Sequence, residues 1–156
     1  MTIRAALALS VLAMLGACTP GGTAPPPGGG TATQTIDVNL TLHAPVQTPY
    51  GQSGGFSPPV TMVPVGSTIR FMNSDGTGVN HTATLVSAST TSFPANPNFS
   101  LNALNRTGTT ISSQWTSGVM ISGTGSQTIL VDKAGTYLFG CFFHYASPMR
   151  GAIVAQ

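Results

Sequence analysis

The chain has 156 residues, of which 41% are hydrophobic and only 5% are charged, and it contains 19 glycines and 12 prolines. This length suits one domain with a single core, and so little charge among so many turn-forming residues favours strands and loops over helices. The net charge of +2 comes without any basic run, which excludes the electrostatic surface that binding to nucleic acid requires.

Residues 1–17 have the pattern of a secretory signal peptide, because Arg4 precedes a short apolar stretch and small residues follow it. The apolar stretch is shorter than the roughly 20 residues of a membrane-spanning helix. Leu-Gly-Ala-Cys at 15–18 resembles a bacterial lipobox, which implies cleavage before Cys18 and lipidation of its thiol. An ordinary signal peptide cleaved nearby is the alternative. We expect a periplasmic protein with a lipid anchor in a bacterial membrane, the outer membrane being favoured over the inner.

Residues 18–33 are rich in Gly and Pro and cannot bury a core, so we expect a tether that leads to a domain at 34–156. If Cys18 carries lipid, Cys141 remains as the one thiol of an exported protein. Such a thiol would oxidise unless a metal protected it. A disulfide between the two cysteines is the alternative, but no folded domain would hold Cys18 in place.

Within the domain, short apolar or alternating runs are separated by Gly, Pro and Asn, which predicts an all-β sandwich of about 7–9 strands. A long loop is expected over residues 87–107, with one helical turn near 101–105. The expected strands are 35–42, 60–63, 67–73, 80–86, 127–131, 136–141 and 151–155, with two less regular ones at 109–115 and 118–122.

Three side chains that can bind a soft metal follow one another near the C-terminus with the spacing Cys-x2-His-x4-Met: Cys141, His144 and Met149. A thiolate and a thioether together select a soft, redox-active metal, and imidazole suits copper. A blue-copper site combines one thiolate, two imidazoles and a weak axial thioether, and His81 supplies the second imidazole from an expected strand. The sequence therefore predicts one copper ion per chain, alternating between Cu⁺ and Cu²⁺, on these four residues.

Each of these side chains has an ordinary alternative role. A methionine near a C-terminal strand usually packs in the core, a single histidine usually lies at the surface, and a lone buried cysteine usually acts as a small hydrophobe. Their coincidence in one order and spacing favours the metal site. The third histidine, His43, has no second ligand near it in the sequence, and we expect it to be structural or exposed.

The run Gly-Thr-Tyr-Leu-Phe-Gly-Cys-Phe-Phe-His-Tyr-Ala-Ser-Pro-Met-Arg-Gly at 135–151 resembles the copper loop of the cupredoxins plastocyanin and, still more, pseudoazurin. The Asn-His pair at 80–81 and the alternating residues 65–71 are similar to that family too. The resemblance spans residues 36–156 and implies a Greek-key β-sandwich with copper at one end. It also implies three equatorial ligands, His81, Cys141 and His144, with Met149 as the axial one.

Two features depart from the family pattern. The chain between His81 and Cys141 is longer than in plastocyanin-like members, so residues 87–126 form an elaboration of unassigned purpose. Position 143 is Phe where the pseudoazurin pattern has Pro. We hypothesise that the backbone N–H of Phe143, which Pro would lack, donates to the Cys141 sulfur and raises the reduction potential.

The predicted function is one-electron transfer by a membrane-tethered periplasmic monomer, with a cytochrome or a copper enzyme as redox partner. Low charge predicts that docking depends on apolar contact around His144. The alternative is a protein for copper storage, delivery or resistance, although the other methionines of the domain, Met62, Met72 and Met120, are scattered. We do not expect an enzyme, because four protein ligands leave no position for a substrate.

Overall fold

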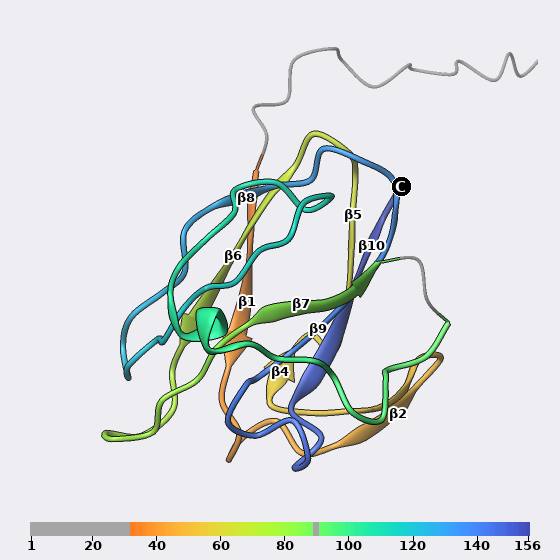
Figure 1. The fold of residues 1–156 in the computed structure, drawn as a ribbon. Coiled ribbons are helices and arrows are strands. Elements are labelled where there is room, and N and C mark those ends of the chain that lie inside the picture. The colour runs from red at the N-terminus through yellow and green to blue at the C-terminus, as the bar shows by residue number, and fades with distance from the viewer. Residues whose placement is uncertain (1–31, 89–90) are drawn as a thin grey trace, which may run out of the picture.

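The computed structural model describes residues 32–88 and 91–156 (Figure 1). The described residues form ten strands and one short 3-10 helix, which confirms the predicted all-β class. None of the helices in this part of the chain is long and apolar enough to cross a membrane. The strands are β1 (Thr33–Val38), β2 (Val46–Thr48), β3 (Gly51–Ser53), β4 (Phe56–Ser57), β5 (Val60–Val63), β6 (Thr68–Asn73), β7 (Thr84–Ala88), β8 (Ile129–Leu130), β9 (Gly135–Gly140) and β10 (Arg150–Ala155).

Two four-stranded sheets form the sandwich, one in the order β4-β1-β6-β8 and the other in the order β5-β10-β9-β7. From β4 to β9 each successive strand lies in the other sheet. β1 pairs in parallel with β6, and β5 pairs in parallel with β10. The hairpin β9–β10 is antiparallel and its loop carries three of the predicted ligands. β2 and β3 form a separate small hairpin.

The core lies between the two sheets because alternate side chains of each strand face inward. Along β6 the buried residues are Ile69, Phe71 and Asn73, with half-buried residues between them. Phe71 stacks on Trp115 at a centroid separation of 5.6 Å and meets the edge of Phe139 at 5.1 Å. These rings anchor β6 and β9 near the end of the sandwich at which the ligands lie.

The seven main predicted strands are present with shifted ends, and the helical turn is the 3-10 helix η1 (Leu101–Leu104). The two less regular predictions, 109–115 and 118–122, are wrong as strands. These residues make only isolated bridges, such as Thr110 with Leu130 and Met120 with His81. The predicted strand 80–86 begins only at Thr84, because residues 81–83 bond to this irregular segment instead of to a sheet neighbour.

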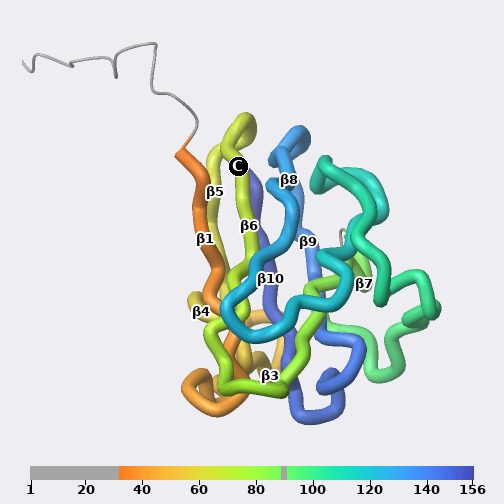
Figure 2. The backbone as a smooth tube through the Cα atoms, turned by 90° about the vertical axis from the view of Figure 1, so that its left-hand side faces the viewer, coloured from red at the N-terminus to blue at the C-terminus, as the bar shows by residue number. Residues whose placement is uncertain are grey.

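The sandwich has two distinct ends. In Figures 1 and 2 the ligand loop between β9 and β10 lies at the lower end, beside the connection from β6 to β7. The start of β1 and the C-terminus lie at the upper end. The candidate site is therefore at the end of the domain opposite to the point where residue 32 enters it.

Candidate metal centre

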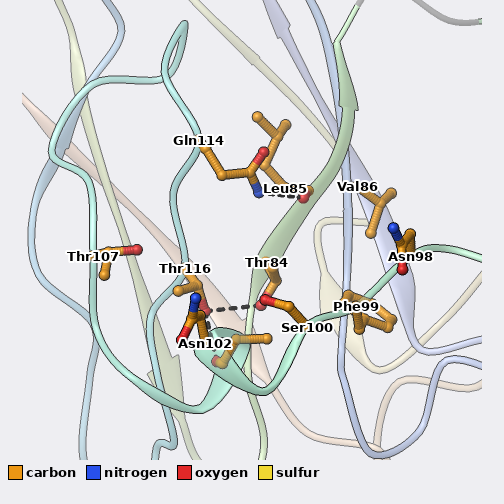
Figure 3. Close-up of a pocket in the computed structure, with 11 residues that line it drawn as sticks. Thr84, Leu85, Val86, Asn98, Phe99, Ser100, Asn102, Thr107, Gln114 and Thr116 are labelled. Carbon is orange, nitrogen blue, oxygen red and sulfur yellow. Dashed lines mark hydrogen bonds between the residues drawn. The ribbon is translucent and has the colours of Figure 1, made fainter.

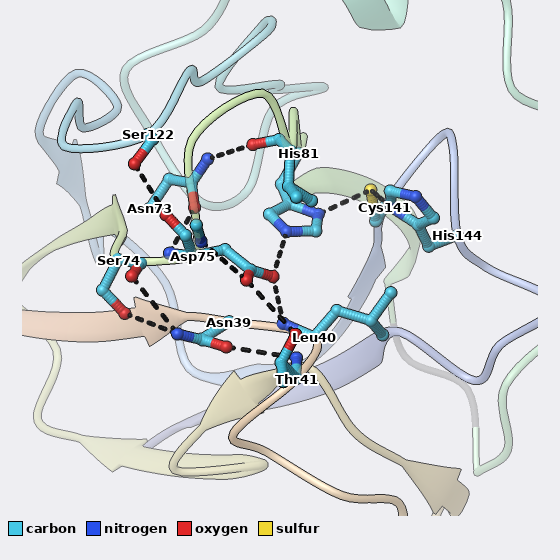
Figure 4. A network of polar contacts seen from close by, with 12 residues as sticks. Asn39, Leu40, Thr41, Asn73, Ser74, Asp75, His81, Ser122, Cys141 and His144 are labelled. Atoms are coloured by element: carbon cyan, nitrogen blue, oxygen red, sulfur yellow. Dashed lines mark hydrogen bonds and ion pairs between the residues drawn. The ribbon is translucent and has the colours of Figure 1, made fainter.

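Three of the predicted ligands converge in space. The Cys141 Sγ lies 3.6 Å from His144 Nδ1 and 3.9 Å from His81 Nδ1, and the possible ligand atoms of the three residues all lie within 4.8 Å of one another. Figure 4 shows the two imidazoles on either side of the sulfur. Since His81 is 60 residues away from Cys141 in the chain, the fold, and not the loop alone, assembles this group.

The backbone of the ligand loop is closed by its own hydrogen bonds. The N–H of Cys141 donates to the Met149 carbonyl at 3.0 Å, and the N–H groups of Ser147 and Met149 both donate to the His144 carbonyl. His81 is fixed from the other side, because its N–H and carbonyl exchange hydrogen bonds with Met120. Both parts of the site are therefore held by backbone pairing before any metal binds.

Met149 is fully buried at the end of the same loop. Its side chain lies directly against Gly55, where a Cβ would come within 2.5 Å of the Met149 Cγ. Gly55 also has a positive φ of 69°, a conformation that other residues rarely adopt. The glycine thus makes room for the Met149 side chain, whose part as the axial ligand stays a prediction.

Backbone N–H groups surround the sulfur. The Thr82 N–H donates to the Cys141 Sγ at 3.4 Å, and the N–H groups of Phe143 and His144 also favour the thiolate. The hydrogen bond that we hypothesised from Phe143 to the sulfur stays a prediction. Burial raises the pKa of the Cys141 thiol, although these N–H groups act in the opposite direction. Without a metal the thiol is therefore protonated at neutral pH, and a metal must displace the proton.

The two imidazoles differ in exposure. His81 is fully buried, whereas His144 is half-buried, so His144 is the ligand that reaches the surface, as the sequence predicted. Burial, followed by the nearby His81, lowers the pKa of His144. A neutral imidazole is the form that binds a metal, and this environment keeps His144 neutral at physiological pH.

The donor set fits a copper ion. Nitrogen and sulfur ligands at about 2.0–2.3 Å from one metal lie roughly 3–4.5 Å apart, and both sulfur–nitrogen separations are within that range. The donors are two imidazoles and one thiolate, with a buried thioether at the end of the same loop. This set is typical of copper sites that contain a cysteine ligand. Three of the four predicted ligands, His81, Cys141 and His144, could therefore hold the ion, and Met149 stays the predicted fourth.

Sequence reasoning missed a carboxylate beside the site. The Asp75 Oδ2 lies 3.0 Å from His81 Nε2. Burial alone would raise the pKa of the Asp75 carboxyl, but hydrogen bonds from His81 and from the backbone of Gly76 and Leu40 lower it to about 2. The only feature of the sequence that could have pointed to Asp75 was the scarcity of acidic residues, of which there are three.

The remaining predictions fall outside this group. His43 pairs with Asp37 at 2.6 Å and takes no part in the site. The signal peptide at 1–17, Cys18 and nearly all of the tether at 18–33 lie outside the described residues. Cys141 is the free cysteine of the part of the chain that the structure describes.

A separate hollow of about 220 Å³ lies between β7 and the segment 98–116 (Figure 3). Its lining contains no titratable side chain, and three of its polar side chains are already paired. The Thr84 and Thr116 hydroxyls bond to each other at 2.8 Å, and the Gln114 amide donates to the Leu85 carbonyl. The hollow therefore offers no acid–base chemistry and no soft metal ligand.

Neither a protein-family model nor a curated protein sequence matches the chain. The chain is similar to solved structures of cupredoxins, at TM-scores below 0.5. They include auracyanin from the photosynthetic bacterium Roseiflexus castenholzii, with 18% identity over 83% of this chain and 99% of that chain and a TM-score of 0.48. A purple cupredoxin from Nitrosopumilus maritimus has 18% identity over 79% and 99%, with a TM-score of 0.47. A mutant fern plastocyanin has 18% identity over 78% and 99%, with a TM-score of 0.46.

Proposed function

We propose that the protein is a one-electron carrier with a single type 1 copper centre. The observation on which this proposal depends is the convergence of His81, Cys141 and His144, with their ligand atoms within 4.8 Å of one another, at one end of a β-sandwich. Bound copper would supply a one-electron couple between Cu⁺ and Cu²⁺. Met149, the fourth proposed ligand, is buried at the end of the same loop.

The protein's contribution is to keep its donors in place while the charge at the site changes. The ligand loop is closed between β9 and β10 by the Cys141–Met149 and His144–Met149 backbone hydrogen bonds. His81 is held by Met120 on the opposite side. A site preorganised by packing and hydrogen bonds needs little rearrangement on electron transfer.

The half-buried His144 gives the electron its shortest route to the surface, because the other two donors of the group are fully buried. Apolar side chains surround it. Phe143 is 44% exposed, and a shallow hollow beside it is lined by Phe142, Pro97 and Ala146 among others. An exposed apolar patch of this kind suits transient docking, so we propose that a redox protein, a cytochrome or a copper enzyme, binds here.

Catalysis is not part of this proposal, because four protein ligands would leave no position on the metal for a substrate. We further propose that the protein is a monomer, exported to the periplasm and tethered through lipid on Cys18, with the outer membrane favoured. The support for this location is the lipobox-like sequence at 15–18 and the Gly- and Pro-rich run that follows it.

The chain offers a matched test, because it has two cysteines. We expect the copper-loaded wild-type protein to show the intense visible absorption of a Cu(II)–thiolate bond. Cys141→Ser should abolish that absorption, whereas Cys18→Ser should keep it and prevent lipidation only. A coloured Cys141→Ser protein would overturn the proposed centre. Rapid reduction and reoxidation by a cytochrome would support the carrier, whereas tight copper binding with no electron exchange would indicate copper storage or delivery instead.

A further inference from the structure

Asp75 is an unusual residue for its surroundings. It is one of three acidic residues in the whole chain and is only 5% exposed, whereas the Asp37 side chain is 37% exposed and Asp132 lies at the surface. Among the described residues its ion-pair partner is His81, with no lysine or arginine at the carboxylate. A buried carboxylate is costly unless it is bonded and useful, so its position beside a proposed copper ligand needs a reason.

The geometry defines which nitrogen of His81 carries the proton. Its Nε2 lies 3.0 Å from the Asp75 Oδ2, while its Nδ1 faces the Cys141 Sγ at 3.9 Å. An ionised carboxylate can only accept hydrogen bonds, and a neutral imidazole has one N–H. The proton therefore belongs on Nε2, which leaves the lone pair of Nδ1 directed toward the other donors (Figure 4).

The carboxylate is itself fixed by several donors. The Leu40 N–H donates to Oδ2 and the Gly76 N–H to Oδ1, both at 2.8 Å, and the Thr41 hydroxyl is 3.4 Å from Oδ1. The Asp75 backbone carbonyl accepts from the Ser122 hydroxyl at 2.6 Å. The carboxylate therefore cannot swing away from His81 without breaking its bonds to the Leu40 and Gly76 N–H groups, and the Ser122 bond holds the backbone from which it projects.

We propose that Asp75 is a positioning residue of the copper centre: its carboxylate fixes the tautomer and the ring orientation of His81 and places a negative charge directly behind that ligand. This inference rests on the proposed copper function. A carboxylate bonded to the outer nitrogen of a ligating histidine makes the imidazole more basic. Its charge, within a poorly solvated environment, also favours the more positive ion. Asp75 therefore stabilises Cu²⁺ over Cu⁺ and lowers the reduction potential.

The first test is Asp75→Asn, which keeps an oxygen that can accept from His81 and removes the charge. We expect the ratio of Cu²⁺ to Cu⁺ affinity to fall at least tenfold, which corresponds to a reduction potential higher by 59 mV or more. Asp37→Asn is the matched control, because it removes the same charge from the other aspartate–histidine pair, His43–Asp37. An unchanged or lower potential in Asp75→Asn, or an equal rise in both variants, would refute the proposal.

A second measurement needs neither copper nor a variant. In the ¹⁵N-labelled, metal-free wild-type protein at about pH 8, well above the ordinary pKa of histidine, NMR can show which ring nitrogen of His81 is protonated. The Nε2–H form supports the proposal, and the Nδ1–H form overturns it even if Asp75→Asn fails to fold. Because this readout is independent of metal, a protein that binds no copper would refute the proposed function separately from the tautomer assignment.

Discussion

The backbone N–H of Phe143 is one of three N–H groups that favour the Cys141 thiolate, and we predict that it donates to the sulfur. Proline at this position would remove that N–H. Each such hydrogen bond withdraws electron density from the thiolate and so favours Cu⁺. Phe143→Pro should therefore lower the reduction potential, by about 60 mV if the hydrogen bond changes the Cu²⁺ to Cu⁺ preference tenfold. Voltammetry of the copper-loaded variant measures this shift.

Phe143→Ala separates the N–H from the ring, because it keeps the N–H and removes the exposed aromatic side chain. The reduction potential of Phe143→Ala should differ from that of the wild-type protein by only a small fraction of the shift seen for Phe143→Pro. If Phe143→Pro left the potential unchanged or raised it, the hydrogen bond at this position would have no tuning role. Phe143 and Asp75 would thus act on the potential in opposite directions, one through the sulfur and the other through His81.

At the scale of elements, the segment 91–99 packs against the ligand loop. The Phe99 ring meets Phe142 at 5.8 Å and Tyr145 at 5.6 Å, and the Tyr145 hydroxyl donates to the Pro94 carbonyl at 2.9 Å. The Arg150 guanidinium lies over the Tyr145 ring at 5.1 Å. This part of the elaboration between His81 and Cys141 therefore braces the loop that holds three of the four proposed ligands.

Tyr145→Phe tests the brace by removing one hydroxyl from a buried ring. We expect the free energy of unfolding to fall by about 1 kcal/mol, the usual net contribution of one hydrogen bond, and copper to leave the site faster under a chelator. Tyr137→Phe is the matched control. Tyr137 is also buried, and its hydroxyl donates to the Lys133 carbonyl at 3.0 Å in the β8–β9 turn.

Both tyrosine variants should lose similar stability in thermal or denaturant unfolding, but only Tyr145→Phe should speed the loss of copper. Equal rates of copper loss in the two variants would show that the segment 91–99 stabilises the fold without bracing the site.

Sequence patterns predicted the longer strands together with β8 and η1, and missed three of the shortest strands. β2, β3 and β4 have only two or three residues, which is too short for an alternation to be visible. The ligand loop was predictable because its three donors are close in sequence. Asp75 was not, because its contact with His81 depends on how the β6–β7 connection turns. Residues 109–115 and 118–122 were predicted as strands, but isolated bridges replace a ladder there.

At the scale of the whole molecule, the two ends of the sandwich have different proposed roles: one receives the tether and the other carries the ligand loop. β1 begins at Thr33, paired with Thr68, and ends at Val38 beside Asn73, close to the network that holds Asp75. A strand of this length spans about 20 Å. The proposed tether, which would enter at Thr33, therefore leaves the ligand loop between β9 and β10 at the far end of the domain, away from the attachment point (Figure 1).

That far end carries almost no free charge. Residues 32–156 contain four basic and three acidic side chains, for a net charge of +1. The basic residue in contact with the ligand loop, Arg150, is engaged with the Phe93 and Tyr145 rings and with the Gln52 carbonyl. Electrostatic steering requires clustered charge, so encounters at this face should depend on apolar contact.

Electron self-exchange between Cu⁺ and Cu²⁺ forms of the protein should then depend little on salt. Between about 0.01 M and 0.5 M ionic strength, over which the Debye length falls from about 30 Å to a few ångströms, we expect the rate constant to change by less than about threefold, as measured by NMR line broadening. Ala146→Lys places a charge on an exposed loop residue, and its self-exchange should be slower at low salt and recover as salt screens the repulsion between two such faces. A wild-type rate that varied by an order of magnitude, or an Ala146→Lys rate without salt dependence, would mean that the molecules meet through a face other than the one around His144.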